Sequence, residues 1–85
     1  RRLTSLSDVF ALGIVMFESL TGYHPYQRNQ HNVGTVRPNA LIAAPNAPRA
    51  LTNLIDGMLN IRTAFRPSPA NVGQTCSDII TQLQP

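Results

Sequence analysis

Few residues of this 85-residue chain have side chains that could carry out chemistry, and their spacing in the sequence does not match a known catalytic or metal-binding motif. Cys76 is the single cysteine, which excludes an internal disulfide, and with only His24 and His31 beside it in the composition it cannot complete a zinc site unaided. We interpret Cys76 as a buried thiol. The sequence has no lysine and no glycine-rich phosphate motif. This sequence therefore contains no P-loop and no lysine that could bind the phosphates of a nucleotide.

The basic residues do not form a nucleic-acid-binding surface in the sequence. Seven basic residues against four acidic ones give a net charge of +3, and all seven are arginines. They are scattered, without a run or a helical stripe, so we expect no nucleic-acid partner. The alternative, an unrelated small helical nucleic-acid binder, predicts an affinity that falls steeply with salt. The arginines are Arg1, Arg2, Arg28, Arg37, Arg49, Arg62 and Arg66.

The composition is that of a folded piece rather than a disordered segment. Hydrophobic residues make up 42% of the chain and charged residues 13%, whereas disorder requires low hydrophobicity and high net charge. The length allows one small domain at most. The most apolar segment, residues 9–17, has about half the length of a membrane-spanning helix, and no basic segment with a cleavage site precedes it. We therefore expect no membrane segment and a cytoplasmic location.

The first of three predicted helices covers residues 7–21. Ser5 and Ser7 are candidate N-caps, Asp8 suits the helix dipole in the first turn, and Gly22 ends the helix. The middle of the helix, residues 9–17, is apolar on every face, which is typical of a helix buried on all sides. Two further helices cannot cover it completely. We therefore expect the chain to be a fragment whose missing polypeptide covers the rest of this helix.

Two amphipathic helices follow a long loop. Residues 22–48 are rich in Asn, Gln, Gly and Pro, which predicts a turn and a loop with at most one short helical turn. Helices are predicted at residues 49–60 and 68–83 because apolar residues recur there at helical spacing, with Ser68 as N-cap and Pro69 at the first position of the last helix. The expected buried stripes are Leu51, Leu54, Ile55, Met58 and Leu59 in one helix, and Val72, Cys76, Ile79, Ile80 and Leu83 in the other. The prediction is an all-α fold of three main helices, with the first one central.

Four short blocks, in this order and spacing, resemble the lower C-lobe of eukaryotic-type serine/threonine protein kinase domains. Residues 7–13 (SDVFALG) are similar to the S-D-x-W-x-x-G opening of the kinase F helix, and residues 21–26 (TGYHPY) to its T-G-x-x-P-F exit. Residues 54–59 (LIDGML) look like L-I-x-x-M-L of the H helix, and residues 66–68 (RPS) like R-P-[ST] at the start of the I helix. The resemblance thus implies an F helix at about 7–21, a turn and loop with a degenerate G helix region at 22–48, an H helix at 49–60 and an I helix at 68–83.

The resemblance implies structural roles for four residues and a candidate substrate contact for a fifth. Asp8 would accept hydrogen bonds from the backbone of the catalytic loop, or it only caps its helix. Phe10 would replace a tryptophan as an aromatic anchor, and Gly13 would allow close approach of neighbouring backbone. Arg66 would form a buried ion pair with the glutamate of the A-P-E motif, without which the fragment would be poorly stable. Glu18 would face a basic substrate, or it only reaches solvent.

None of these residues is implied to be catalytic, cofactor-binding or metal-binding. Kinase chemistry requires a lysine at the ATP phosphates, an aspartate base with its asparagine, and an aspartate that holds magnesium; in the family all of them precede the position of Arg1. The resemblance implies a parent enzyme that uses ATP and magnesium to phosphorylate protein hydroxyls, with this chain as the scaffold of its catalytic loop. The alternative is a pseudokinase or a truncated, non-catalytic interaction module. Ser19, where relatives place an apolar residue, and the poor G helix pattern are departures from the family.

Overall fold

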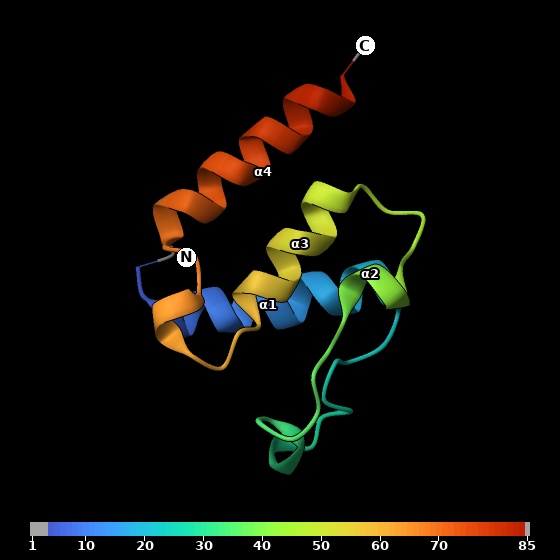
Figure 1. Ribbon diagram of the computed structural model, residues 1–85, viewed down its shortest axis with the longest axis vertical. Coiled ribbons are helices and arrows are strands. Elements are labelled where there is room, and N and C mark those ends of the chain that lie inside the picture. The colour runs from blue at the N-terminus through green and yellow to red at the C-terminus, as the bar shows by residue number, and fades with distance from the viewer. Residues whose placement is uncertain (1–3, 85) are drawn as a thin grey trace.

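The computed structural model describes residues 4–84 and is helical, with no β-strand in that range (Figure 1). The predicted all-α class is confirmed. Two single turns of 3-10 helix, Gln30–Asn32 and Thr63–Phe65, lie in the loops, where the first is followed by an isolated bridge between Val33 and Val36. The α-helices are α1 (Leu6–Thr21), α2 (Ala40–Ala43), α3 (Arg49–Met58) and α4 (Pro69–Leu83).

Local sequence signals set both ends of α1. The Ser5 hydroxyl accepts a hydrogen bond from the Asp8 backbone N–H at 3.1 Å, which satisfies one of the free donors of the first turn. At the other end Gly22 adopts φ 85°, a left-handed conformation that glycine tolerates without strain. Its N–H donates to the Glu18 carbonyl at 2.8 Å and closes the last turn. The helix therefore begins one residue before the expected range of 7–21 and ends where that range ends.

The hydrophobic core consists of two clusters, and both α1 and α3 contribute to each of them. One cluster joins α1, α3 and α4 through Val9, Leu54, Met58, Val72 and Ile79. The other joins α1, α2 and α3 through Phe17, Ala40, Ile55 and Leu59. The α3 helix can serve both because its apolar residues occupy two adjacent rows at helical spacing. It thus shares the central position that the sequence assigned to the first helix alone.

One face of α1 is open in the described part of the chain. Val9, Gly13 and Phe17 form its buried row, whereas Ala11 and Val15 are exposed, Val15 by 58%. The remaining helices pack on one side of α1 and leave the other side uncovered, as the small number of helices led us to expect. The apolar residues on every face of this helix therefore find only part of their cover within residues 4–84.

The last helix is less buried than its apolar pattern predicts. Ser68 caps α4 by accepting from the Asn71 N–H at 3.1 Å, and Pro69 occupies the first turn as expected. However, Ile80 and Leu83 are exposed by 58% and 65%, and Cys76 is half-buried rather than buried. Figure 1 shows the reason, because the C-terminal half of α4 projects beyond the other helices. The expected stripe is thus wrong at Ile80 and Leu83.

Gly13 allows α1 and α3 to cross closely, and this predicts opposite effects for two glycine-to-alanine substitutions. A Cβ at position 13 would lie 2.9 Å from the Met58 Cβ and 3.2 Å from the Leu59 Cδ2, whereas a Cβ at Gly73 in α4 would meet nothing within 4 Å. We expect Gly13→Ala to lower the free energy of unfolding by about 1–3 kcal/mol through overpacking. We expect Gly73→Ala to raise it by about 0.5–1 kcal/mol through helix propensity.

Urea unfolding followed by circular dichroism at 222 nm measures both effects. Gly73→Ala is the matched control, since it makes the same chemical change in a helix without a crossing. A Gly13→Ala variant as stable as the parent chain would contradict the close packing of α1 on α3.

Candidate functional site

Arg66 connects the ends of three helices through hydrogen bonds to backbone carbonyl groups. Its Nη1 donates to the Leu6 carbonyl at 2.8 Å, at the start of α1. Its Nε and Nη2 donate to the Asn60 carbonyl at 3.0 and 2.7 Å, just after α3, and Nη2 also reaches the Ile61 carbonyl at 3.3 Å. The five donors of a guanidinium make such a fork possible, and a lysine could not reproduce it. Arg66 lies three residues before the first residue of α4 and thus connects this helix to α1 and α3.

The ring of Phe10 lies under this guanidinium. The Arg66 Cζ is 5.0 Å from the centre of the Phe10 ring, a cation–π distance. The ring of Phe10 also stacks on the ring of Tyr26, with 6.0 Å between the two ring centroids. Tyr26 is only 1% exposed. The structure therefore brings together two of the predicted anchors, Phe10 and Arg66, which are 56 positions apart in the numbering. The implied glutamate partner of Arg66 stays a prediction, while its guanidinium already has neutral acceptors within the chain.

The other residues singled out in the sequence lie apart from this cluster. Asp8 accepts hydrogen bonds from the Thr4 N–H and hydroxyl, both at 3.2 Å, so its contacts include the local ones expected of a helix start. Glu18 forms an exposed ion pair with Arg28 at 3.0 Å. Gly13 lies at the crossing of α1 and α3. Their implied kinase roles stay predictions.

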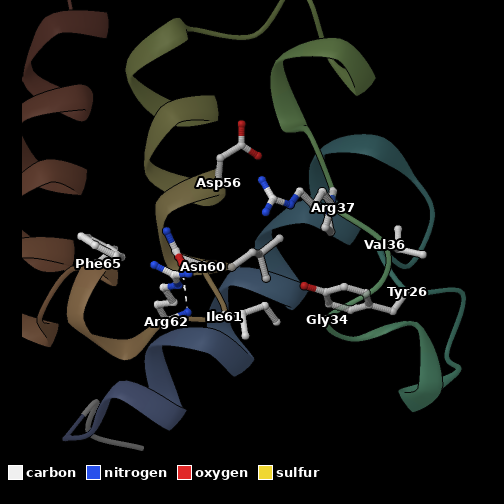
Figure 2. A pocket seen from close by; sticks show the side chains of 11 residues that line it. Tyr26, Gly34, Val36, Arg37, Asp56, Asn60, Ile61, Arg62 and Phe65 are labelled. Carbon is white, nitrogen blue, oxygen red and sulfur yellow. Dashed lines mark hydrogen bonds between the residues drawn. The ribbon is translucent and has the colours of Figure 1, made fainter.

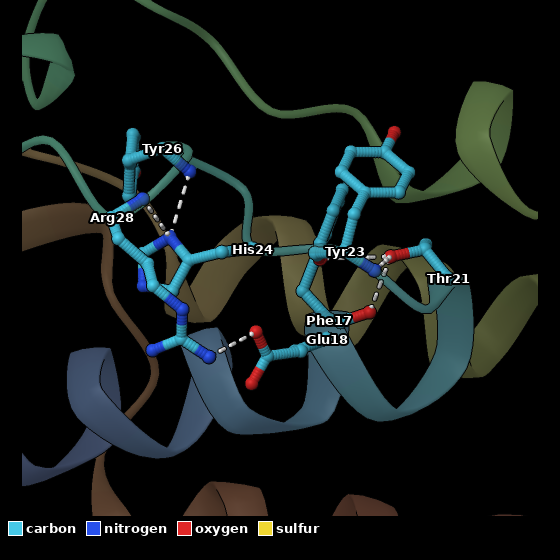
Figure 3. Close-up of polar contacts among 7 residues, drawn as sticks. All are labelled: Phe17, Glu18, Thr21, Tyr23, His24, Tyr26 and Arg28. Carbon is cyan, nitrogen blue, oxygen red and sulfur yellow. Dashed lines mark hydrogen bonds and ion pairs between the residues drawn. The ribbon is translucent and has the colours of Figure 1, made fainter.

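His24 organises the turn that follows α1, a role that the sequence did not suggest. Its Nδ1 accepts hydrogen bonds from the Tyr26 N–H at 3.1 Å and from the Arg28 N–H at 3.2 Å (Figure 3). Gln27 and Arg28 both adopt positive φ angles, 54° and 57°, which non-glycine residues rarely do. The Nδ1 atom of His24, by accepting from Tyr26 and Arg28, fixes the backbone on both sides of Gln27. The only signal for this role in the sequence is the position of His24 between Gly22 and Pro25.

A pocket of about 460 Å³ lies beside Tyr26, between the loop before α2 and the end of α3 (Figure 2). Its walls come from four separate stretches of the chain, so no local sequence pattern could have indicated it. It combines two arginines, one carboxyl group and one phenol with apolar side chains. The lining residues are Tyr26, Gly34, Val36, Arg37, Pro38, Asp56, Leu59, Asn60, Ile61, Arg62 and Phe65.

Two groups of this pocket titrate away from their ordinary range. Burial raises the pKa of the Tyr26 phenol, an effect that the positive charge of Arg66 partly offsets. Burial also raises the pKa of the Asp56 carboxyl, which hydrogen bonds from the backbone N–H groups of Ala40 and Leu41 partly offset. The Ala40 N–H lies 2.7 Å from the Asp56 Oδ1, so Asp56 also fixes the start of α2.

Within the described range, residues 4–84, no three His, Cys, Asp or Glu side chains are grouped so that they could hold a metal ion. In the same range no helix has the length and apolar character needed to cross a bilayer.

Comparisons of the chain with protein-family models, with curated proteins and with solved structures gave no match.

The fork of hydrogen bonds from Arg66 predicts that charge alone cannot replace it. Arg66→Lys keeps the positive charge, but a single ammonium group cannot donate to the carbonyl groups of Leu6, Asn60 and Ile61 at the same time. We expect the free energy of unfolding in urea to fall by about 1–3 kcal/mol, the cost of leaving such acceptors without partners. Arg62→Lys is the matched control, because the Arg62 guanidinium makes no hydrogen bond to the described residues. Equal stabilities of the two variants would contradict the role of Arg66.

The double acceptor at His24 predicts a difference between two substitutions of similar size. The Oδ1 of asparagine can take the place of Nδ1, whereas leucine offers no acceptor. We expect His24→Leu to lower the free energy of unfolding by about 1–2 kcal/mol, because two backbone N–H groups lose their partner, and His24→Asn to change it by less than about 0.5 kcal/mol. Urea titration of both variants measures this. Equal losses of unfolding free energy in the two variants would mean that the packing of the His24 ring against Tyr26, with 6.3 Å between the ring centroids, matters rather than the acceptor.

Proposed function

We propose that this chain is the C-terminal portion of a protein serine/threonine kinase domain and serves as the scaffold for its catalytic loop. The observation that best supports the proposal is the contact of Arg66 with Phe10 and with the Leu6 carbonyl. It joins the R-P-S block to the S-D-x-W-x-x-G block, as expected if both blocks belong to one packed lobe. The crossing of Gly13 with Met58 joins the latter block to the L-I-x-x-M-L block in the same way.

The open face of α1 supports the scaffold role. Val15 is 58% exposed in a helix that is apolar on every side, a pattern typical of a helix that is buried all round. In the proposal the preceding part of the kinase domain covers this face, and Asp8 at the start of α1 holds the catalytic loop. The parent enzyme binds ATP and magnesium, phosphorylates hydroxyl groups of protein substrates and works in the cytoplasm. Residues 4–84 themselves contribute position and not phosphoryl-transfer chemistry.

A second candidate is a pseudokinase or a truncated interaction module that does not catalyse phosphoryl transfer. The observation in its favour is the set of exposed apolar side chains on α2 and α4, where Ile42 is 76% and Leu83 65% exposed. Residues 27–48 contain only the four-residue helix α2 and one 3-10 turn where active relatives have a G helix. Partner binding without catalysis would use the same exposed surface.

A phosphoryl-transfer assay on the extended protein separates the two candidates. The chain is expressed together with the upstream coding region, and transfer of labelled phosphate from ATP to casein is measured. The proposal predicts magnesium-dependent transfer that is lost when the aspartate of the upstream H-R-D motif is changed to asparagine. A folded extended protein without transfer to casein or to itself would favour the interaction module.

Two substitutions within the chain test the scaffold role in the same assay. Asp8→Asn removes the charge that would anchor the catalytic loop, and we expect it to lower kcat at least about tenfold, the loss from a misplaced catalytic group. Asp78→Asn in α4 is the matched control, because among residues 4–84 the Asp78 side chain bonds only Gln74 of its own helix. If both variants kept full activity, the anchoring role of Asp8 would be wrong even for an active kinase.

A further inference from the structure

The Tyr26 hydroxyl is a buried polar group without a partner in the part of the chain that the structure describes. Tyr26 is 1% exposed, and its oxygen makes no hydrogen bond there. Buried hydroxyl groups nearly always have a partner, because an unpaired one is costly. Figure 2 shows the hydroxyl directed toward Ile61, into the pocket between the loop and the end of α3. A group bound in this pocket could supply the missing acceptor.

The charged residues around the pocket favour an acceptor that carries negative charge. Arg37 and Arg62 line it from two different segments, and neither guanidinium forms a hydrogen bond or an ion pair with residues 4–84. Asp56 is the only carboxylate among the lining residues, and its Oδ1 already accepts from the Ala40 N–H. Arg66 adds a positive charge that acts on Tyr26. Guanidinium groups and a phenol together are donors suited to a carboxylate or a phosphate.

The apolar residues that line the rest of the pocket favour a ligand in which the anionic group is attached to an apolar body. Val36, Ile61 and Phe65 line the pocket and remain 41%, 49% and 63% exposed. The volume of about 460 Å³ falls in the range of small-molecule sites, which combine apolar walls with a few placed polar groups. The pKa values of Tyr26 and Asp56, both raised by burial, belong to residues of this pocket, and such shifts gather at functional sites.

From these observations we propose that the pocket beside Tyr26 binds a small organic anion, a carboxylate or phosphate on an aromatic or aliphatic body. The anion accepts a hydrogen bond from the Tyr26 hydroxyl after a small side-chain adjustment and is paired by Arg37 and Arg62. The body packs against Val36 and Phe65. This inference goes beyond the proposed kinase function and does not depend on it.

The test is an NMR titration of the 15N-labelled chain with phenyl phosphate as the probe. We expect saturable shifts confined to the amides of the pocket, such as those of Gly34, Arg37 and Ile61. Benzoate tests the carboxylate form, and inorganic phosphate, which lacks the apolar body, should bind more weakly. Benzylamine carries the same ring with a positive charge and should cause no such shifts. The absence of localised shifts with both aromatic anions would overturn the proposal.

Three variants decide whether the binding uses the residues named. Tyr26→Phe deletes only the unpaired hydroxyl, so the fold should persist while the Kd for phenyl phosphate rises about tenfold, the worth of one hydrogen bond to a charged acceptor. Arg37→Gln should raise the Kd by a similar factor. Arg49→Gln makes the same change of net charge at the start of α3, outside the pocket, and should leave the Kd unchanged. An unchanged Kd in Tyr26→Phe, or equal effects of Arg37→Gln and Arg49→Gln, would show only general attraction to a cationic chain.

Discussion

The hydrogen-bond fork of Arg66 is the interaction on which the arrangement of this molecule depends most. Hydrophobic packing is not directional, and the two core clusters alone would tolerate several angles between short helices. The guanidinium removes that freedom, because it must meet the carbonyl groups of Leu6 and Asn60 and the face of Phe10 at the same time. It also supplies donors to the carbonyl groups of Asn60 and Ile61 in the segment that follows α3. The alignment of α1, α3 and α4 follows from these contacts.

Much of the fold could be predicted from the sequence, because its signals are local. Ser5, Gly22 and Ser68 cap helices where capping residues were expected, and the apolar spacing located α3 and α4. The exposure of Leu83 could not be predicted in this way. Periodicity shows which face of a helix is apolar, but not how far a neighbouring helix extends along it.

The candidate sites, in contrast, depend mostly on contacts between residues that are far apart in the sequence, and local patterns do not reveal such contacts. Gly13 and Arg66 were singled out through a resemblance, and their contacts with Met58 and Leu6 involve distant parts of the chain. The acceptor role of His24 and the pocket beside Tyr26 were not predicted from the sequence. A hydrogen bond from backbone N–H groups to a ring nitrogen depends on φ angles that no residue pattern encodes, and the pocket is assembled from segments that meet only after folding.

The central claim is that these residues form the lower part of a kinase C-lobe, and the coding sequence immediately upstream of Arg1 tests it most directly. That sequence can be determined from the transcript without any assumption about folding or activity. The account predicts an A-P-E motif a short distance before Arg1, whose glutamate would pair with Arg66, and before it D-F-G, H-R-D and the ATP-binding lysine. An authentic start of translation at Arg1, or an upstream sequence without these motifs, would contradict the enzymatic account.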